Sequence, residues 1–366
     1  MSILPLTTRI DANLGYACNN DCLFCYFKER KRTRNSISTQ QAKRLFSRIK
    51  RLGIETLEIT GGEVTIRDDI IELIAFAKRD LRFKKITVIT NGSRFCDEEF
   101  TASASAAGVD DVLISLHGSS ARLHDKLVGR GGAYDNAVEA INNVIRAGIS
   151  CRTNTVVTAY NYREASNIAA LIYSLGVRKV NYIYFSPLDD AANVETDLWV
   201  RYSDTASHIR AMLSLYKDKF KAISIKVFPF CLLGGYEEYI TNFFQNIYDP
   251  YEWDFYNRVR IRRNMLQRDL AVAAGLLLFM DIRRILQIGF RKSCYESIVR
   301  VQSFRECVKA HVCRRCKYDY ICPGIWKSYA QRFGMNELNP VLGKKIKDLD
   351  FCLRKRFSDY PIEPYA

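Results

Sequence analysis

The sequence predicts an α/β fold in which a run of parallel strands and helices is followed by a smaller, cysteine-rich domain. Strand-like and helix-like segments alternate at a steady rhythm through the first 190 residues. Glycines at positions 53, 108, 148 and 176 each follow a helix-like segment and precede a strand, which is where helix C-terminal caps fall. Beyond about residue 190 this rhythm breaks, and cysteines gather between residues 294 and 352.

The predicted strands and helices of the first half alternate along the chain. The strands are expected at 8–14, 55–59, 86–90, 111–116, 151–157 and 179–185, and the helices at 39–51, 69–80, 97–107, 134–147 and 162–175. Repeated β–α units of this kind form a parallel sheet with right-handed crossovers, either open or curled into a barrel. In both forms the chemistry gathers at the carboxyl ends of the strands.

The second half is expected to form an accessory domain. A helix near 203–221 leads into the strand ISIKVFPF, which ends at Cys231, and an aromatic and basic stretch follows at 236–292. We therefore predict a catalytic domain over about 1–190, extended to 222 by the linking helix. The accessory domain is predicted at 223–366, with 236–292 as an insertion.

The composition favours an intracellular protein that uses metal or redox chemistry. No basic stretch followed by an apolar run opens the chain, so a cytoplasmic location is expected. The longest apolar run, LAVAAGLLLFM at 270–280, is shorter than the roughly 20 residues that cross a bilayer, and it predicts a buried helix. Twelve cysteines without an export signal indicate metal or redox work rather than disulfides. The net charge of +15 is compatible with an acidic partner, nucleic acid or an anionic substrate.

A C-x3-C-x2-C motif, CNNDCLFC, follows the first predicted strand and contains Cys18, Cys22 and Cys25. Three thiolates this close can hold three corners of a cubane iron–sulfur cluster, leaving one iron open to another ligand. Zinc is the alternative, but a structural zinc site takes four protein ligands, and no nearby His or Cys supplies the fourth. The aromatic Phe24, directly before the last cysteine, adds specificity to the motif.

This motif and those below resemble the radical S-adenosylmethionine (SAM) superfamily. The resemblance implies a partial (β/α)6 TIM-like barrel whose [4Fe–4S] cluster binds SAM through the open iron. It further implies reductive cleavage of SAM to a 5′-deoxyadenosyl radical, which abstracts hydrogen from the substrate. The difficult chemistry would belong to the cofactors, while the protein holds and shields them.

Further motifs end the next strands, as the resemblance leads us to expect. Gly61, Gly62 and Glu63 (ITGGEVT) match the family's GGE motif, in which backbone carbonyls and Glu63 would accept bonds from the SAM ammonium. The remaining candidates for binding SAM are Asn91 in ITNG, Ser115 and His117 in LISLHG, Arg130, and Asn154 in CRTNTVV. Simple turns, strand ends and strand packing remain the alternative explanations for Asn91, His117 and Asn154. No catalytic side chain is predicted.

A second cysteine motif, CRRCKYDYICPG, contains Cys313, Cys316 and Cys322. It resembles the C-terminal module of radical SAM enzymes with a SPASM or shortened "twitch" domain, such as anaerobic sulfatase-maturing enzymes, peptide maturases and the molybdenum-cofactor cyclase. An auxiliary [4Fe–4S] cluster is therefore expected, with zinc as the rival because C-x2-C is a generic metal motif.

The auxiliary cluster needs a fourth ligand, for which Cys231 is the first choice and Cys294 and Cys307 are the alternatives. One auxiliary cluster is favoured over two, because the Gly-x-Cys element of a full SPASM module is missing. Four protein ligands would indicate electron relay, whereas a missing one would leave room for substrate. Cys96, Cys151 and Cys352 are interpreted as ordinary buried thiols.

The combined motifs predict an enzyme that modifies a residue within a peptide or protein by oxidation, cross-linking or epimerisation. The alternative substrate is a small anionic metabolite or nucleotide in cofactor biosynthesis. Because the printed sequence begins almost at its first strand, no leader-peptide-binding domain is expected before it, and this expectation counts against peptide maturation. A flavodoxin- or ferredoxin-type reductant is the expected partner. A zinc-ribbon nucleic-acid binder would suit the charge but leaves the GGE motif and the strand rhythm unexplained. A membrane partner is not expected either.

Overall fold

The computed structural model divides the chain into two compact units. One is Asp11–Ile225, and the other joins Met1–Ile10 with Lys226–Ala366. The structure describes residues 9–32, 35–51, 53–185, 196–241, 282–288, 293, 297, 300, 303–304, 306–347 and 351–356. Most of the predicted insertion at 236–292, including the apolar run at 270–280, lies outside the described residues, as does Cys294. Among the described residues, no helix is long and apolar enough to cross a membrane.

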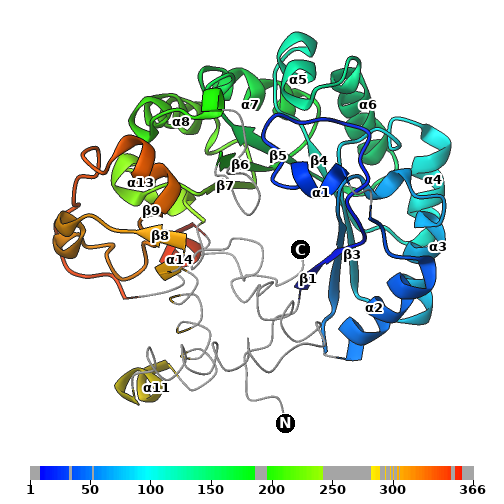
Figure 1. Ribbon diagram of the computed structural model, residues 1–366, viewed down its shortest axis with the longest axis horizontal. Coiled ribbons are helices and arrows are strands. Elements are labelled where there is room, and N and C mark those ends of the chain that lie inside the picture. The colour runs from blue at the N-terminus through cyan, green and yellow to red at the C-terminus, as the bar shows by residue number, and fades with distance from the viewer. Residues whose placement is uncertain are drawn as a thin grey trace. The chain divides into compact units, whose positions relative to one another are not determined.

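A seven-stranded sheet in the order β1 to β7 forms the centre of the fold. Its strands are β1 (Arg9–Asn13), β2 (Thr56–Thr60), β3 (Lys85–Thr90), β4 (Asp111–Ser115), β5 (Ser150–Val157), β6 (Lys179–Tyr184) and β7 (Ala222–Lys226). The pairs from β2 to β6 are parallel. The sheet curves, and helices lie along its outer side (Figure 1). The predicted half-barrel is therefore confirmed, with one strand more than the six expected, because the segment assigned to the accessory domain supplies β7.

Helices connect these strands. They are α1 (Lys28–Arg32), α2 (Thr39–Arg51), α3 (Ile70–Ala75), α4 (Glu98–Ala107), α5 (Ala121–Val128), α6 (Ala133–Arg146), α7 (Ala165–Ser174) and α8 (Tyr202–Tyr216). Short turns precede or extend them: η1 (Val64–Ile66), the π-helical η2 (Phe76–Asp80), η3 (Tyr162–Glu164) and η5 (Thr196–Leu198). The helix predicted at 69–80 is thus an α-helix that widens into a π-turn. Neither α1 nor α5 was among the predicted helices.

The helix ends follow from the residue types. Asp97 caps α4 by accepting the backbone N–H of Glu99 at 2.9 Å, and Gly108 closes the helix with a φ of 107°. An added Cβ at Gly108 would lie 2.4 Å from the Lys78 side chain, so glycine is required there for space as well as conformation.

Successive side chains of a strand point to opposite sides of the sheet, so the two faces of this sheet carry different residues. Leu57 and Ile59 of β2 alternate with Glu58, and all three are buried. Glu58 is in register with Thr87, which is in register with Asp111. Apolar residues therefore pack against the helices, and the opposite, concave face carries polar side chains.

A buried ion trio crosses the concave face. Arg152 of β5 donates to Asp111 of β4 at 2.7 Å and to Glu58 of β2 at 3.1 Å. All three residues are less than 5% exposed. The guanidinium holds the pKa of Asp111 below its usual value, although burial alone would raise it. The trio thus links β2 to β4 and β5, which are not its neighbours in the sheet.

The unit that contains Lys226–Ala366 is made of short elements. They are η6 (Phe230–Leu232), η7 (Glu237–Tyr239), α11 (Ile282–Ile288), β8 (Cys307–Val308), η8 (His311–Arg315), β9 (Ile325–Trp326), α13 (Lys327–Phe333) and α14 (Phe351–Arg356). β8 and β9 pair antiparallel, with Cys307 opposite Trp326. Tyr318 packs in parallel on Phe230 with ring centroids 4.9 Å apart, which fixes the loop of the second cysteine motif against η6.

Candidate functional site

The loop that follows β1 carries Cys18, Cys22 and Cys25 and is held by backbone bonds on both sides. Leu14 donates to the carbonyl of Thr60 at 2.9 Å, and Tyr16 donates to that of Asn35 at 2.9 Å. Residues 14–25, called the cysteine loop below, therefore start at the carboxyl end of β2, where the fold class places chemistry.

The two glycines after β2 let the chain approach the cysteine loop closely. Gly62 donates to the carbonyl of Gly15 at 2.9 Å, and Glu63 donates to that of Ala17 at 2.8 Å. An added Cβ on Gly62 would lie 2.2 Å from the Ala17 carbonyl oxygen, which no real contact allows. The GGE motif therefore holds the backbone directly before Cys18.

The carboxylate of Glu63 is buried and accepts four hydrogen bonds within the protein. Oε1 accepts from the Thr65 backbone and hydroxyl at 3.0 and 2.6 Å and from the Thr90 hydroxyl at 2.8 Å. Oε2 accepts from the Asn91 backbone at 2.5 Å. Burial raises the pKa of Glu63, while the bonds from Asn91, Thr65 and Thr90 lower it. The side chain thus joins the ends of β2 and β3, and its predicted contact with SAM stays a prediction.

Asn19, inside the cysteine motif, ties this loop to the end of β3 and to the residue that follows the C-terminal cap of α5. Its amide nitrogen donates to Ser93 at 2.8 Å, and its amide oxygen accepts from Asn91 at 2.7 Å. Its backbone carbonyl accepts from the Arg130 guanidinium at 3.2 Å. Asn91 and Arg130, predicted separately as SAM ligands, therefore meet on one residue that the sequence analysis did not single out.

The second half of the cysteine loop is bonded to the end of α5. Asp21 donates to the carbonyl of Val128 at 2.9 Å, and Leu23 donates to that of Leu127 at 3.0 Å. Gly129 ends the helix with a φ of 64°, and an added Cβ there would lie 2.5 Å from the Asp21 carbonyl. The segment HDKLVGRGG is distinctive in the sequence, but no local sequence pattern predicts that it contacts the cysteine loop.

His117 lies beneath the cysteine loop in a buried histidine pair. The ring of Phe24 meets the His117 ring edge-on at 4.6 Å. The Nδ1 atom of His117 accepts the Val156 N–H at 3.1 Å, and the backbone N–H of His117 donates to Nδ1 of His124 at 3.0 Å. Burial lowers the pKa of His117 well below its usual value and that of His124 to about 4. Both rings are therefore neutral at pH 7, and Phe24 is supported by an uncharged neighbour.

Two other predicted SAM contacts lie side by side on the concave face. Ser115, the last residue of β4, is in register with Asn154 of β5, and Asn154 is in register with Asn181 of β6. The side-chain oxygen of Asn154 is buried without a hydrogen-bond partner among the described residues. A buried amide oxygen of this kind is satisfied by a bound donor, so its position fits a ligand.

The three thiols of the cysteine loop resist ionisation in the protein alone. Burial raises the pKa of Cys18, Cys22 and Cys25, and for Cys22 the neighbouring Cys25 and Cys18 raise it further. The ammonium of Lys31 acts in the opposite direction on all three. Iron ligands are thiolates, so a bound metal would supply the positive charge that this crowded set needs. The donor set therefore fits a cluster held by three sulfurs.

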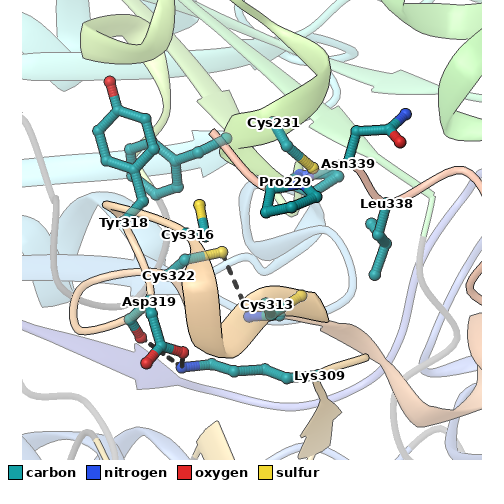
Figure 2. Close-up of a pocket in the computed structure, with 13 residues that line it drawn as sticks. Pro229, Cys231, Lys309, Cys313, Cys316, Tyr318, Asp319, Cys322, Leu338 and Asn339 are labelled. Carbon is teal, nitrogen blue, oxygen red and sulfur yellow. Dashed lines mark hydrogen bonds and ion pairs between the residues drawn. The ribbon is translucent and has the colours of Figure 1, made fainter. Parts of the chain in front are cut away.

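A second group of cysteines surrounds a pocket in the unit that contains Lys226–Ala366. Cys231 from η6 faces Cys313, Cys316 and Cys322 across this pocket (Figure 2). Burial, together with the three thiols, raises the pKa of Cys231 to about 12. The Sγ atom of Cys322 accepts the Gly324 N–H at 3.4 Å. The structure therefore brings together the three cysteines of the second motif and the predicted fourth.

The residues that line this pocket bear on which metal it could hold. Four thiols line it, which is the number of protein ligands taken by a closed [4Fe–4S] cluster and by a structural zinc site alike. Within the described ranges, no three His, Cys, Asp or Glu side chains converge closely enough to hold a single metal ion. The donor set of the pocket therefore fits an auxiliary cluster, with zinc as its rival.

The remaining described cysteines lie outside the lining of this pocket. Cys307 is buried on β8, and burial together with Cys322 raises its pKa to about 12. Cys352 on α14 is buried, whereas Cys96 and Cys151 are partly buried.

Comparison with known proteins supports this geometry. Residues 12–187 match the family profile described as the radical SAM superfamily. The mycofactocin maturase MftC of Mycolicibacterium smegmatis is 35% identical over 164 residues, which cover 44% of this chain and 41% of the relative. A probable GTP 3′,8-cyclase of Saccharolobus solfataricus is 30% identical over 176 residues, which cover 48% of this chain and 56% of the relative. The chain thus spans about half the length of these curated relatives.

Solved structures agree on the fold. Streptococcus suis SuiB bound to S-adenosylmethionine has a TM-score of 0.50 at 18% identity, covering 58% of this chain and 48% of SuiB. A histidine-tagged form of anSMEcpe with bound AdoMet also has a TM-score of 0.50, at 15% identity, covering 58% of this chain and 59% of the other. At these identities the likeness concerns the fold alone.

Proposed function

Because residues 12–187 belong to the radical SAM superfamily, we propose that this chain cleaves S-adenosylmethionine reductively and abstracts hydrogen from a substrate. The family match and the maturase relatives indicate an enzyme. The observation that carries the proposal is that three separate segments of the chain contact one loop. The GGE segment, Asn91 and Arg130 all bond to residues 15–19, directly beside Cys18.

In this proposal Cys18, Cys22 and Cys25 hold a [4Fe–4S] cluster and leave one iron for SAM. When bound, these two cofactors supply the electron and the 5′-deoxyadenosyl radical, and the protein supplies position and shielding. Gly61 and Gly62 permit the close approach of the backbone that fixes Cys18. Leu23 and Phe24 pack on a buried apolar cluster of Leu127, Phe185 and Leu198, which excludes water from that side of the loop.

The SAM molecule is proposed to lie across the carboxyl ends of β2 to β5. Asn154 would use its unpartnered amide oxygen to accept from SAM, with Ser115 beside it. Glu63 and Arg130 would act mainly by fixing the neighbouring backbone, because both side chains already bond to protein groups. His117 would hold Phe24 in place rather than bind SAM.

Cys231, Cys313, Cys316 and Cys322 are proposed to hold an auxiliary [4Fe–4S] cluster. The support is that all four line one pocket and that the three thiols of the second motif help to raise the pKa of Cys231. With four protein ligands such a cluster has no open iron, so it would pass electrons instead of binding substrate.

A residue within a peptide or protein is the proposed substrate. The support is the 35% identity, over 164 residues, to the relative that is named mycofactocin maturase. The second candidate is a small anionic metabolite or nucleotide, favoured by the 30% identity to a probable GTP cyclase and by the net charge of +15. A flavodoxin- or ferredoxin-type protein is the proposed electron donor.

Anaerobic reconstitution with iron and sulfide, followed by a 5′-deoxyadenosine assay under dithionite, tests this function. We expect about eight irons per chain, as two cubanes require, and formation of 5′-deoxyadenosine. Replacing Cys18, Cys22 and Cys25 with Ala should leave about four irons and abolish SAM cleavage. Cleavage that survives this replacement, or zinc in place of iron, would refute the assignment.

A further inference from the structure

Two segments in and beside the second cysteine motif are rich in positive charge. The segments 311–317 (HVCRRCK) and 341–347 (VLGKKIK) contain six Lys or Arg residues and no Asp or Glu. We call them together the basic face. The cationic residues are Arg314, Arg315, Lys317, Lys344, Lys345 and Lys347, and all except the half-buried Lys317 are exposed.

The two segments are joined by hydrogen bonds, although they are far apart in the sequence. Lys317 donates to the carbonyl of Val341 at 2.7 Å, and Ile346 donates to that of Lys317 at 2.8 Å. The ammonium of Lys345 donates to the carbonyl of Cys316 at 3.0 Å. The basic face is therefore built onto the loop that carries Cys313 and Cys316.

One described carboxylate pairs with this face. Asp319 lies 3.2 Å from the ammonium of Lys309 and 3.5 Å from that of Lys345, so a single negative charge is shared between two cations and the net charge there stays positive. Two large apolar side chains are exposed within the same segments, Val312 at 41% and Leu342 at 64%. Exposed apolar side chains among positive charges are typical of a protein docking surface.

We propose that the basic face docks an acidic one-electron carrier protein, which passes its electron to the cluster held by Cys231, Cys313, Cys316 and Cys322. This inference rests on the auxiliary cluster of the proposed function. In the transfer the carrier is oxidised by one electron and the cluster is reduced by one. A carrier is favoured over other acidic partners because the charges lie on the loop of the second cysteine motif itself, and electron transfer slows steeply with distance. Opposite charge would speed the encounter and orient the complex.

A charge-reversal variant of the full, reconstituted chain tests the proposal. Arg314→Glu, Arg315→Glu and Lys344→Glu change exposed side chains and no proposed ligand. The matched control, Arg44→Glu, Arg51→Glu and Lys221→Glu, lowers the net charge by the same amount on exposed residues of the other unit. The probe is an acidic flavodoxin, measured as the dissociation constant of its oxidised form and as the rate at which the reduced form loses its electron.

We expect the basic-face variant to bind flavodoxin about tenfold more weakly, to lose the salt dependence of the encounter, and to keep full reduction by dithionite. The control should match the wild type in all three measurements. Equal weakening in both variants would show a general effect of net charge and would overturn the proposal, as would no change in either. If the triple variant loses iron, Lys344→Gln with Lys347→Gln repeats the measurement without touching the segment between the cysteines.

Failure of the proposed function would look different. An iron count of about four in the wild type would remove the auxiliary cluster, and this inference with it. About eight irons with unaltered flavodoxin binding in the variant would overturn the docking surface alone.

Discussion

The carboxylate of Glu63 accepts the backbone N–H of Asn91 at 2.5 Å, while the backbone of Glu63 donates to Ala17 at 2.8 Å. One residue therefore fixes both the end of β3 and the entry to the cysteine loop. A displacement of the Glu63 side chain or of its backbone would therefore move Cys18, which directly follows Ala17. The first prediction follows from this coupling.

Replacing Glu63 with Ala should weaken both SAM binding and folding. The change leaves donors of Thr65, Thr90 and Asn91 without an acceptor, at a cost of about 1–3 kcal/mol for each one that stays buried. We expect at least tenfold weaker SAM binding by equilibrium titration and a lower melting temperature. Glu72→Ala, which removes an exposed carboxylate on α3, is the control. Unchanged SAM affinity in Glu63→Ala would contradict the role of Glu63.

Replacing Gly62 with Ala should displace the cysteine loop, because the new Cβ would lie 2.2 Å from the Ala17 carbonyl oxygen. The expected result is loss of about half of the bound iron and of SAM cleavage, measured by iron assay and 5′-deoxyadenosine formation. Gly131→Ala is the matched control, because an added Cβ meets nothing within 4 Å there. If both alanine variants keep their iron, the close approach at Gly62 does not matter for the cluster.

The fourth auxiliary ligand can be identified by two single replacements. Cys231 lines the pocket with the three cysteines of the second motif, whereas Cys307 does not. Cys231→Ala should therefore lower the iron content or alter the electron paramagnetic resonance spectrum of the auxiliary cluster. Cys307→Ser should keep both. The reverse pattern would assign the ligand to Cys307 instead.

Asn154 is expected to contact SAM directly through its unpartnered oxygen. Asn154→Ala should raise the dissociation constant of SAM by roughly tenfold, the loss of one or two hydrogen bonds. The melting temperature of the SAM-free protein should hold or rise, since the buried oxygen has no partner to lose. A fall in stability without a change in SAM affinity would show that Asn154 only packs the strand.

The buried histidine pair predicts a loss of stability in mild acid. Burial lowers the pKa of His124 from 6.5 to about 4, so the unfolded chain takes up a proton as the pH falls through 6.5 and the folded chain does not. The free energy of unfolding is therefore highest above pH 6.5. Between pH 6.5 and 4 it falls by about 3 kcal/mol because of this residue. A protonated Nδ1 also cannot accept the His117 N–H.

Urea unfolding at about pH 7.5 and about pH 5 measures this effect. His124→Asn should flatten the pH dependence, because asparagine offers an acceptor that does not titrate in this range. His208→Asn is the control, since that histidine is partly exposed and packs edge-on against Tyr162. An equal flattening in the control would exclude His124 as the source.

The sequence predicted those parts of the fold and of the site that depend on residues close together in the chain. The rhythm of strands and the caps at Gly108 and similar positions depend on neighbouring residues, and so does the spacing of Cys18, Cys22 and Cys25. The Asn19 contacts join residues 72 and 74 positions apart, and no local pattern marks them. β7 was not among the six strands expected in the sheet, because its apolar run continues into FPFC, whereas sheet membership is decided by tertiary pairing.

The hydrogen bonds of Glu63 show the same limit. The resemblance implied that Glu63 accepts bonds from the SAM ammonium, and that contact stays a prediction. Two of the donors that surround its carboxylate, on Thr90 and Asn91, lie 27 and 28 positions away, and no local pattern marks them. Cys231, in contrast, was the first choice among three candidate cysteines, and it lines the pocket together with the second motif.

The ion trio of Glu58, Asp111 and Arg152 has a consequence for how the strands find their places. A strand that paired one residue out of step would turn its charge toward the apolar side, and a lone buried charge costs several kcal/mol. Wrong alignments of β2, β4 and β5 are therefore disfavoured. The trio selects the register of these strands, and the positions of the strand ends that contact the cysteine loop depend on that register.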